Sequence, residues 1–197
     1  AAAATQANVV YKLVKTGETF VTSGARKLTY SWVPSDSSKP TEVMHVIQVD
    51  LTNPHVQLNA LGGKGGSVTS RQSVTAMAKE SGAVAGINGD VFGTTGEGAP
   101  LGAQVVSGRL VVSTAQLQGM YAFAVTKDKK PLIDQFQFEG SVTAADGTSF
   151  ALTGLNKSAY RTEPNKAFSH QNALYMYTSA WTAAERPTGS STTPTEA

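Results

Sequence analysis

Only one stretch of the 197-residue chain carries a helical pattern, and this restricts the possible folds more than any other feature. Val74, Met77 and Ala78 recur at the spacing of one helix face, and Gly82 follows them as a stop signal. We expect the N-cap of this helix at residues 69–70, where Thr and Ser stand. The apolar stripe is short, so the helix is expected to pack against other elements rather than to stand alone.

The rest of the chain is read as short strands, because β-branched and aromatic residues gather in runs that turn signals separate. These runs cover residues 9–15, 27–33, 43–51, 103–106, 109–113, 120–126, 132–156 and 173–181. We expect residues 55–61 to pair back on residues 43–51 as a hairpin. Ser107-Gly108 and Asp146-Gly147 predict tight hairpin turns. The predicted fold class is α+β, a mostly antiparallel mixed sheet with one clear helix.

Composition narrows the function classes. The chain has 16 Lys and Arg against 14 Asp and Glu, and a net charge of +2 predicts no basic surface for nucleic acid. The basic residues 127–130 are expected to form a solvated turn. The absence of cysteine excludes a disulfide scaffold and a thiol nucleophile. No apolar run reaches the length of a membrane helix, so no membrane span is expected.

The two ends of the chain have distinctive compositions. The first eight residues, AAAATQAN, resemble the remnant that cleavage behind an Ala-x-Ala site leaves, and a frayed terminus is the alternative. Together with the richness in Thr, Ser, Gly and Asn, they favour a secreted or cell-surface location. Residues 187–197 are rich in Thr, Ser and Pro, and we expect a mobile tail or an inter-segment loop there, after a domain over residues 1–186.

The histidines give no metal site. His45 and His55 can face each other across the expected hairpin, but no third ligand stands at a defined spacing. We therefore expect these two residues and His170 to be core or edge histidines, and we expect no metal and no cofactor. The chain has no Gly-x-Ser-x-Gly elbow, which argues against a Ser-His-Asp triad.

The most informative stretch begins with the apolar residues 83–88, which we read as a buried central strand. This run ends on Asn88, Gly89 and Asp90, and a glycine-rich loop that contains Glu97 follows. A strand that ends in polar residues and glycines places those side chains at a sheet edge, where ligands bind. A long hairpin connection without a ligand is the alternative.

This stretch resembles the signature of the phosphodiester glycosidase family, which is an apolar strand, Asn-Gly-x-x-Phe, a variable loop, Pro-x-Gly, a strand and a small turn. The matching residues are Asn88, Gly89, Phe92, Pro100, Gly102 and Gly108. The upstream strand, the helix and the later segment LYMYTSAW are also similar to bacterial members, so the resemblance spans residues 43–181. It implies hydrolysis of sugar-1-phosphodiester or related glycosidic bonds in envelope or exopolysaccharide glycans.

The resemblance and the loop together suggest roles for individual residues. Asp90 is the candidate catalytic carboxylate, which activates water or stabilises an oxocarbenium ion, and Asn88 is the second catalytic candidate. The substrate-binding candidates are Gly89, Phe92, Glu97, Gly102, Arg71, Arg161 and Tyr177. The two arginines among them are candidate phosphate clamps, with a surface role as the alternative for each.

One departure from the family pattern concerns the second half of the family's domain. The family's domain continues into a second half with a Val-Asp-Gly type motif and a Leu-Asp-Gly-Gly-Gly-Ser motif, and this sequence contains neither. The resemblance therefore implies a domain that is incomplete without a C-terminal complementing segment, which a second chain or a longer form of this one supplies. The alternative is a non-catalytic cell-surface module that binds glycan or assembles with other subunits. The expected ligand is a carbohydrate or a sugar phosphate.

Overall fold

The computed structural model describes residues 9–94, 96–114, 120–161 and 167–187. Contacts divide the chain into two compact units, Ala1–Gln57 and Leu58–Ala197, and each unit is described by itself. The predicted fold class is confirmed, because the described residues form one α-helix and small, mostly antiparallel sheets. The expected signal-peptide remnant and residues 188–197 of the expected tail lie outside the described residues.

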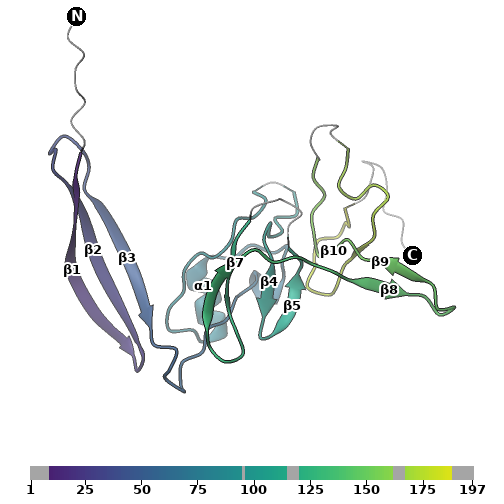
Figure 1. The fold of residues 1–197 in the computed structure, drawn as a ribbon, viewed down its shortest axis with the longest axis horizontal. Helices are drawn as coiled ribbons and strands as arrows, with labels where there is room; N and C mark the ends of the chain where they lie inside the picture. The colour runs from purple at the N-terminus through teal and green to yellow at the C-terminus, as the bar shows by residue number, and fades with distance from the viewer. Residues whose placement is uncertain (1–8, 95, 115–119, 162–166, 188–197) are drawn as a thin grey trace, which may run out of the picture. The chain divides into compact units, whose positions relative to one another are not determined.

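The first unit is an antiparallel sheet in the order β1-β2-β3 (Figure 1). The strands span Tyr11–Thr22 (β1), Ala25–Pro34 (β2) and Glu42–Val49 (β3). The three strands predicted in this region therefore form, but the predicted hairpin partner of the third is wrong. Residues 56–61 form no strand. β3 instead pairs with β2, which offers it a continuous ladder from Ala25↔Val49 to Trp32↔Glu42.

In the second unit, helix α1 spans Val74–Ser81. Its predicted end is confirmed, since Gly82 takes the left-handed conformation at φ 71° and its backbone N–H bonds to the last carbonyls of the helix. Its predicted start is wrong, because the N-cap is Ser73, whose hydroxyl accepts the backbone N–H three residues on at 3.2 Å. Thr69 is used elsewhere, as the acceptor for the backbone N–H groups of residues 182–183 at 3.0 and 2.9 Å.

Short hairpins make up much of the described part of the second unit. They pair Gln104–Val106 (β4) with Arg109–Val112 (β5), Ala122–Val125 (β6) with Pro131–Asp134 (β7), and Ser141–Thr143 (β8) with Ser149–Ala151 (β9). Ser107 and Gly108 have φ values of 49° and 77°, as a two-residue type I′ turn requires. The predicted turns at residues 127–130 and at Asp146-Gly147 also connect paired strands.

The strand predicted over residues 83–88 does not form. These residues are irregular, and Val84 and Ile87 are 69% and 77% exposed. No strand of the described chain pairs with them, so their backbone joins no ladder and the side chains of Val84 and Ile87 remain largely exposed. The prediction of a buried central strand is therefore wrong for this structure.

The core of the second unit gathers residues from distant parts of the sequence. It consists of Val68, Ala99, Val112 and Trp181, each at most 4% exposed. The Trp181 indole N–H donates to the Glu185 carbonyl at 2.9 Å. Beside this core, Gly154–Leu155 (β10) pairs in parallel with Tyr175–Met176 (β11).

Asn156 connects these short elements. It is fully buried, and its φ of 51° lies in the left-handed region. Its Nδ2 donates to the Val111 carbonyl at 2.7 Å and to the Thr178 hydroxyl at 2.9 Å, and its Oδ1 accepts from the Thr178 N–H at 2.9 Å. One amide side chain therefore joins the end of β10 to β5 and to the residues after β11.

Asn156→Ala should destabilise the chain more than the matched Asn172→Ala. Asn172 also has a left-handed φ, 54°, but it is exposed, so both substitutions place alanine in the same unfavourable conformation at roughly 1–2 kcal/mol. Asn156→Ala in addition leaves buried backbone groups unsatisfied, which should lower the free energy of unfolding by about 2 kcal/mol more. Urea denaturation measures both values, and equal losses would contradict the role assigned to the Asn156 amide.

Candidate functional site

The glycine-rich loop folds back on itself as a narrow antiparallel turn. Phe92 and Pro100 form an isolated β-bridge across it. The Leu101 N–H donates to the Val91 carbonyl at 2.9 Å, and the Gly93 N–H donates to the carbonyl of residue 99 at 3.2 Å. Backbone hydrogen bonds therefore hold the two limbs of the loop together, which brings residues at its start close to residues at its end.

Asp90 fastens the first limb to the second. Its Oδ1 accepts from the Val91 N–H at 2.7 Å, and its Oδ2 accepts from the Gly102 N–H at 3.2 Å. A Cβ atom on Gly102 would lie only 2.9 Å from Asp90 Oδ1, so any larger residue there would push the carboxylate away from its present position. The orientation of the Asp90 carboxylate is thus fixed by two backbone amides.

Gly102→Ala and Gly89→Ala form a matched pair of substitutions. Alanine at residue 102 should displace the Asp90 carboxylate and lower the free energy of unfolding by about 1–2 kcal/mol, the value of a charge-assisted hydrogen bond. A Cβ on Gly89 would meet no atom within 4 Å. Gly89→Ala should therefore change stability by less than about 0.5 kcal/mol. Thermal unfolding tests the pair, and similar losses in both variants would rule out the steric requirement at Gly102.

Lys157 lies against the second limb of the loop from a different segment, and it is only 9% exposed. Its Nζ donates to the carbonyls of Leu101 at 2.7 Å, Gly102 at 3.3 Å and Pro100 at 3.5 Å. Burial lowers the pKa of Lys157 to about 8, while the negative charge of Asp90 acts in the opposite direction. The same limb is therefore held by an ammonium on its carbonyl side and by a carboxylate on its amide side.

Lys157 should give the stability of the chain a defined dependence on pH. Its pKa is about 8 in the folded chain and 10.5 ordinarily, so between these values the unfolded chain binds more protons. The contribution of this group to the free energy of unfolding is therefore lowest below pH 8 and rises as the pH increases from 8 to 10.5. Lys157→Met removes the titration.

Urea denaturation between pH 7 and 10.5 tests this sign. As the pH rises, the free energy of unfolding of the wild type should increase relative to that of Lys157→Met. A constant difference between the two would contradict the assignment. Lys127→Met, at an exposed lysine of the β6–β7 turn, is the control and should run parallel to the wild type.

Glu97 reaches the segment next to Lys157 from the middle of the loop. Its Oε2 accepts from the Ser158 hydroxyl at 3.1 Å, and the residue is partly buried. Its negative charge also acts on the pKa values of His170 and Tyr177, which places these two side chains in its neighbourhood. Asp90 and Glu97 therefore both lie near residues 157–158.

His170 and Tyr177 form a hydrogen-bonded pair behind this segment. His170 Nε2 lies 2.8 Å from the Tyr177 hydroxyl, which donates to the Lys157 carbonyl at 2.7 Å, and His170 Nδ1 lies 2.9 Å from Ser169 Oγ. Burial is the largest cause of both pKa shifts, lowering the pKa of His170 and raising that of Tyr177, so both groups are neutral at pH 7. Tyr177, predicted to bind substrate, is hydrogen-bonded within the protein.

The histidine expectation holds in part. His170 is a buried core residue at 7% exposure, as the sequence indicates. His45 lies exposed on β3, an edge strand of its sheet, which also agrees with the expectation, whereas His55 is exposed in a turn. The two do not face each other across a hairpin, because that hairpin does not form.

The two arginines have different surroundings. Arg71 donates to the Thr94 carbonyl at 2.8 Å, and its guanidinium carbon lies 5.6 Å from the centre of the ring of Phe92. Arg71 therefore contacts the loop at two of its residues. The guanidinium carbon of Arg161 lies 3.7 Å from the centre of the ring of Phe168, with which Arg161 forms an isolated antiparallel bridge. Arg71 therefore contacts the loop directly, whereas Arg161 lies over the ring of Phe168.

Two residues of the candidate site were not predicted from the sequence. The predicted residues that lie on or against the loop are Asp90, Glu97, Gly102, Arg71 and Phe92, of which Asp90, Arg71 and Phe92 are exposed. Asn88 and Gly89 lie on the irregular stretch before the loop and are also exposed. Lys157 and Ser158 were missed. The available signal was a lysine inside the otherwise uncharged segment GLNKSAY, where a charge needs a specific partner if the segment is buried.

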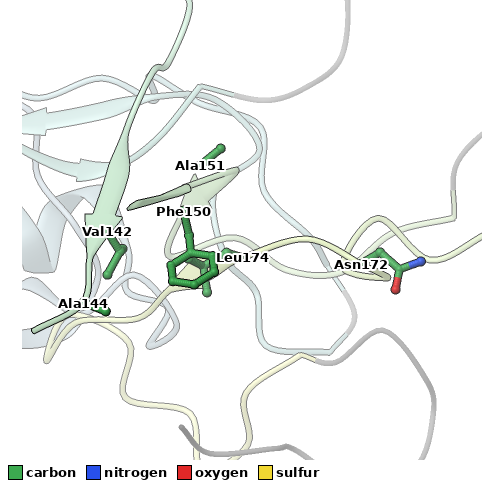
Figure 2. A pocket seen from close by; sticks show the side chains of 6 residues that line it. All are labelled: Val142, Ala144, Phe150, Ala151, Asn172 and Leu174. Carbon is green, nitrogen blue, oxygen red and sulfur yellow. The ribbon is translucent and has the colours of Figure 1, made fainter. Parts of the chain in front are cut away.

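A hollow of about 490 Å³ lies elsewhere, along the β8–β9 hairpin (Figure 2). Its lining residues are Val142, Ala144, Phe150, Ala151, Asn172 and Leu174. Figure 2 shows Val142, Phe150 and Leu174 grouped together, with the Asn172 amide set apart from them. This lining is apolar and carries no charged group, so it does not suit a sugar phosphate, and the polar cluster at the loop remains the better candidate.

Comparison with known proteins adds no relative: no family model, no curated protein and no solved structure matches this chain. Among the described residues, no group of three or more His, Cys, Asp or Glu side chains is placed to hold a metal ion. The same residues include no helix with the length and apolar character that crossing a membrane requires.

Proposed function

We propose that this chain supplies the glycine-rich loop of a glycosidase-type site that cleaves sugar-1-phosphodiester bonds in envelope or exopolysaccharide glycans. The observation that carries the proposal is the placement of two carboxylates, Asp90 and Glu97, on one loop beside residues 157–158. Glycoside hydrolysis uses two carboxyl groups at the scissile bond. A phosphate is a good leaving group, so the reaction depends less on protonation of the departing oxygen than on stabilising the sugar cation.

The proposal gives each group a role that suits its surroundings. Asp90, oriented by two backbone amides, stabilises positive charge at the anomeric carbon. Glu97, hydrogen-bonded to a hydroxyl, activates the attacking water. Arg71 provides donors for the phosphate. Asn88, exposed before the loop, provides an amide for sugar hydroxyls.

The proposal also includes a C-terminal complementing segment, from a second chain or from a longer form of this one. Val84 and Ile87, 69% and 77% exposed beside the loop, support it, because a run of large apolar side chains is normally covered. Action on envelope or exported glycans places the protein outside the cell or at its surface.

A second candidate function is a glycan-binding module without catalysis. The observation in its favour is that both Asp90 oxygens already accept backbone N–H groups, which is the arrangement of a structural carboxylate. Such a loop can still bind a sugar phosphate through Arg71, Asn88 and backbone amides.

Titration with N-acetylglucosamine-1-phosphate, followed by NMR of the backbone amides, tests whether the loop binds this class of ligand. We expect shifts within residues 88–102 and about tenfold weaker binding by Asn88→Ala, because one hydrogen bond is lost. Hydrolysis of the methyl phosphodiester of the same sugar by the domain together with its complementing segment, followed by phosphorus NMR, separates the two candidates.

The hydrolysis assay has a matched pair of carboxylates. Glu97→Gln should abolish turnover, and Glu139→Gln, at an exposed carboxylate away from the loop, should not. Binding without turnover would favour the module. If the domain shows no binding and no turnover, both functions are refuted.

A further inference from the structure

We infer that Lys157 is the positioning residue of the candidate site: its ammonium group holds the second limb of the loop and thereby keeps the Asp90 carboxylate in place. The inference deepens the proposed function, and its link to catalysis rests on that function. Its structural part, the control of the loop by one side chain, can be tested without any substrate.

The first step is the use of the ammonium's hydrogen bonds. An ammonium has three N–H donors and no acceptor. Lys157 Nζ directs them to three consecutive carbonyls, those of Pro100, Leu101 and Gly102, at 3.5, 2.7 and 3.3 Å. The donor capacity is therefore spent inside the protein, so Lys157 acts on the loop backbone rather than as a phosphate clamp.

The second step is the coupling to Asp90. Gly102 is held on both sides, because its carbonyl accepts from Lys157 and its N–H donates to Asp90 Oδ2 at 3.2 Å. A displacement of this limb therefore changes both the contact with Lys157 and the hydrogen bond to the Asp90 carboxylate. The absence of a Cβ at residue 102 allows the carboxylate its close approach.

The third step is the rigidity of the base from which Lys157 extends. Its carbonyl accepts from the Tyr177 hydroxyl at 2.7 Å and lies 3.2 Å from His170 Nε2. The preceding residue, Asn156, is fully buried and hydrogen-bonded to β5. The Lys157 side chain therefore connects the loop to a backbone that the core holds in place.

The burial of the charge supports this role. At 9% exposure, a lysine loses most of its hydration, and an apolar side chain of similar length would fill the same space without that cost. The ammonium group donates directional hydrogen bonds to three carbonyls, which an apolar side chain cannot do.

Amide hydrogen exchange of Lys157→Met tests the inference. Methionine fills the space but donates no hydrogen bond. Exchange at Leu101 and Gly102 should become roughly tenfold faster or more, the effect of losing hydrogen bonds from a charged group, while amides of β5 stay unchanged. The control Lys127→Met should leave both regions unchanged. Unchanged exchange at the loop, or an equal increase throughout the second unit, would overturn the inference.

A chemical rescue removes the objection that the variant is merely damaged. The chain contains no cysteine, so Lys157→Cys carries a single thiol. In the unfolded chain its thiolate displaces bromide from 2-bromoethylamine, and refolding gives a side chain that ends in an ammonium at nearly the lysine length. Alkylation with 1-bromopropane gives an uncharged side chain of matched size. The aminoethyl form should restore the protection of residues 101–102 and the propyl form should not, and equal behaviour of the two would refute the role of the charge.

The catalytic link has its own readout. If the wild type hydrolyses the sugar-1-phosphodiester, Lys157→Met should lower kcat with little change in KM, and the aminoethyl form should recover kcat, since the residue acts through the geometry of Asp90. If the wild-type domain with its complementing segment is inactive while its loop still depends on Lys157, the proposed function alone is refuted. If the wild type is active but Lys157→Met leaves amide exchange at the loop unchanged, the inference alone is refuted.

Discussion

The buried amide of Asn156 is the contact on which the described part of the second unit depends. β10 and β11 pair over only two residues each, too few to be stable by themselves. Three side-chain hydrogen bonds from Asn156 tie their ends to each other and to β5. Because the chain turns through a left-handed residue at this point, the two residues that follow it meet the glycine-rich loop. The position of the candidate site is therefore set by a polar group in the core.

The charged groups at the described part of the loop are satisfied by backbone groups and a hydroxyl rather than by salt bridges. Asp90 is met by backbone amides, Lys157 by backbone carbonyls and Glu97 by a hydroxyl. Lys157 is buried and needs such partners, Glu97 is partly buried, and Asp90 is exposed but held by two backbone amides. Dipoles that are already oriented before the reaction stabilise the charge that develops in a transition state. The same oriented dipoles serve selective binding of a sugar phosphate, which is why the two candidate functions share one site.

Parts of this architecture follow from local sequence signals, and parts do not. The end of α1 at Gly82 and the turn at residues 107–108 were predicted, because each depends on backbone angles that glycine favours. The strand at residues 83–88 and the hairpin at residues 55–61 were predicted wrongly. Both predictions rested on apolar composition, and whether an apolar run becomes a strand depends on whether a partner strand lies beside it.

The sequence by itself determined the α+β class, the single helix with its glycine stop, the tight turns, and a polar loop rich in glycine with two carboxylates. These features are encoded within a few neighbouring residues, through side-chain periodicity and the angles that glycine and asparagine favour. Only the tertiary structure decided that Lys157 meets Leu101, 56 positions away, and that His170 meets Tyr177 behind it. The contact between Lys157 and the loop leaves no periodic trace in the sequence, because it depends on how the core brings the two segments together.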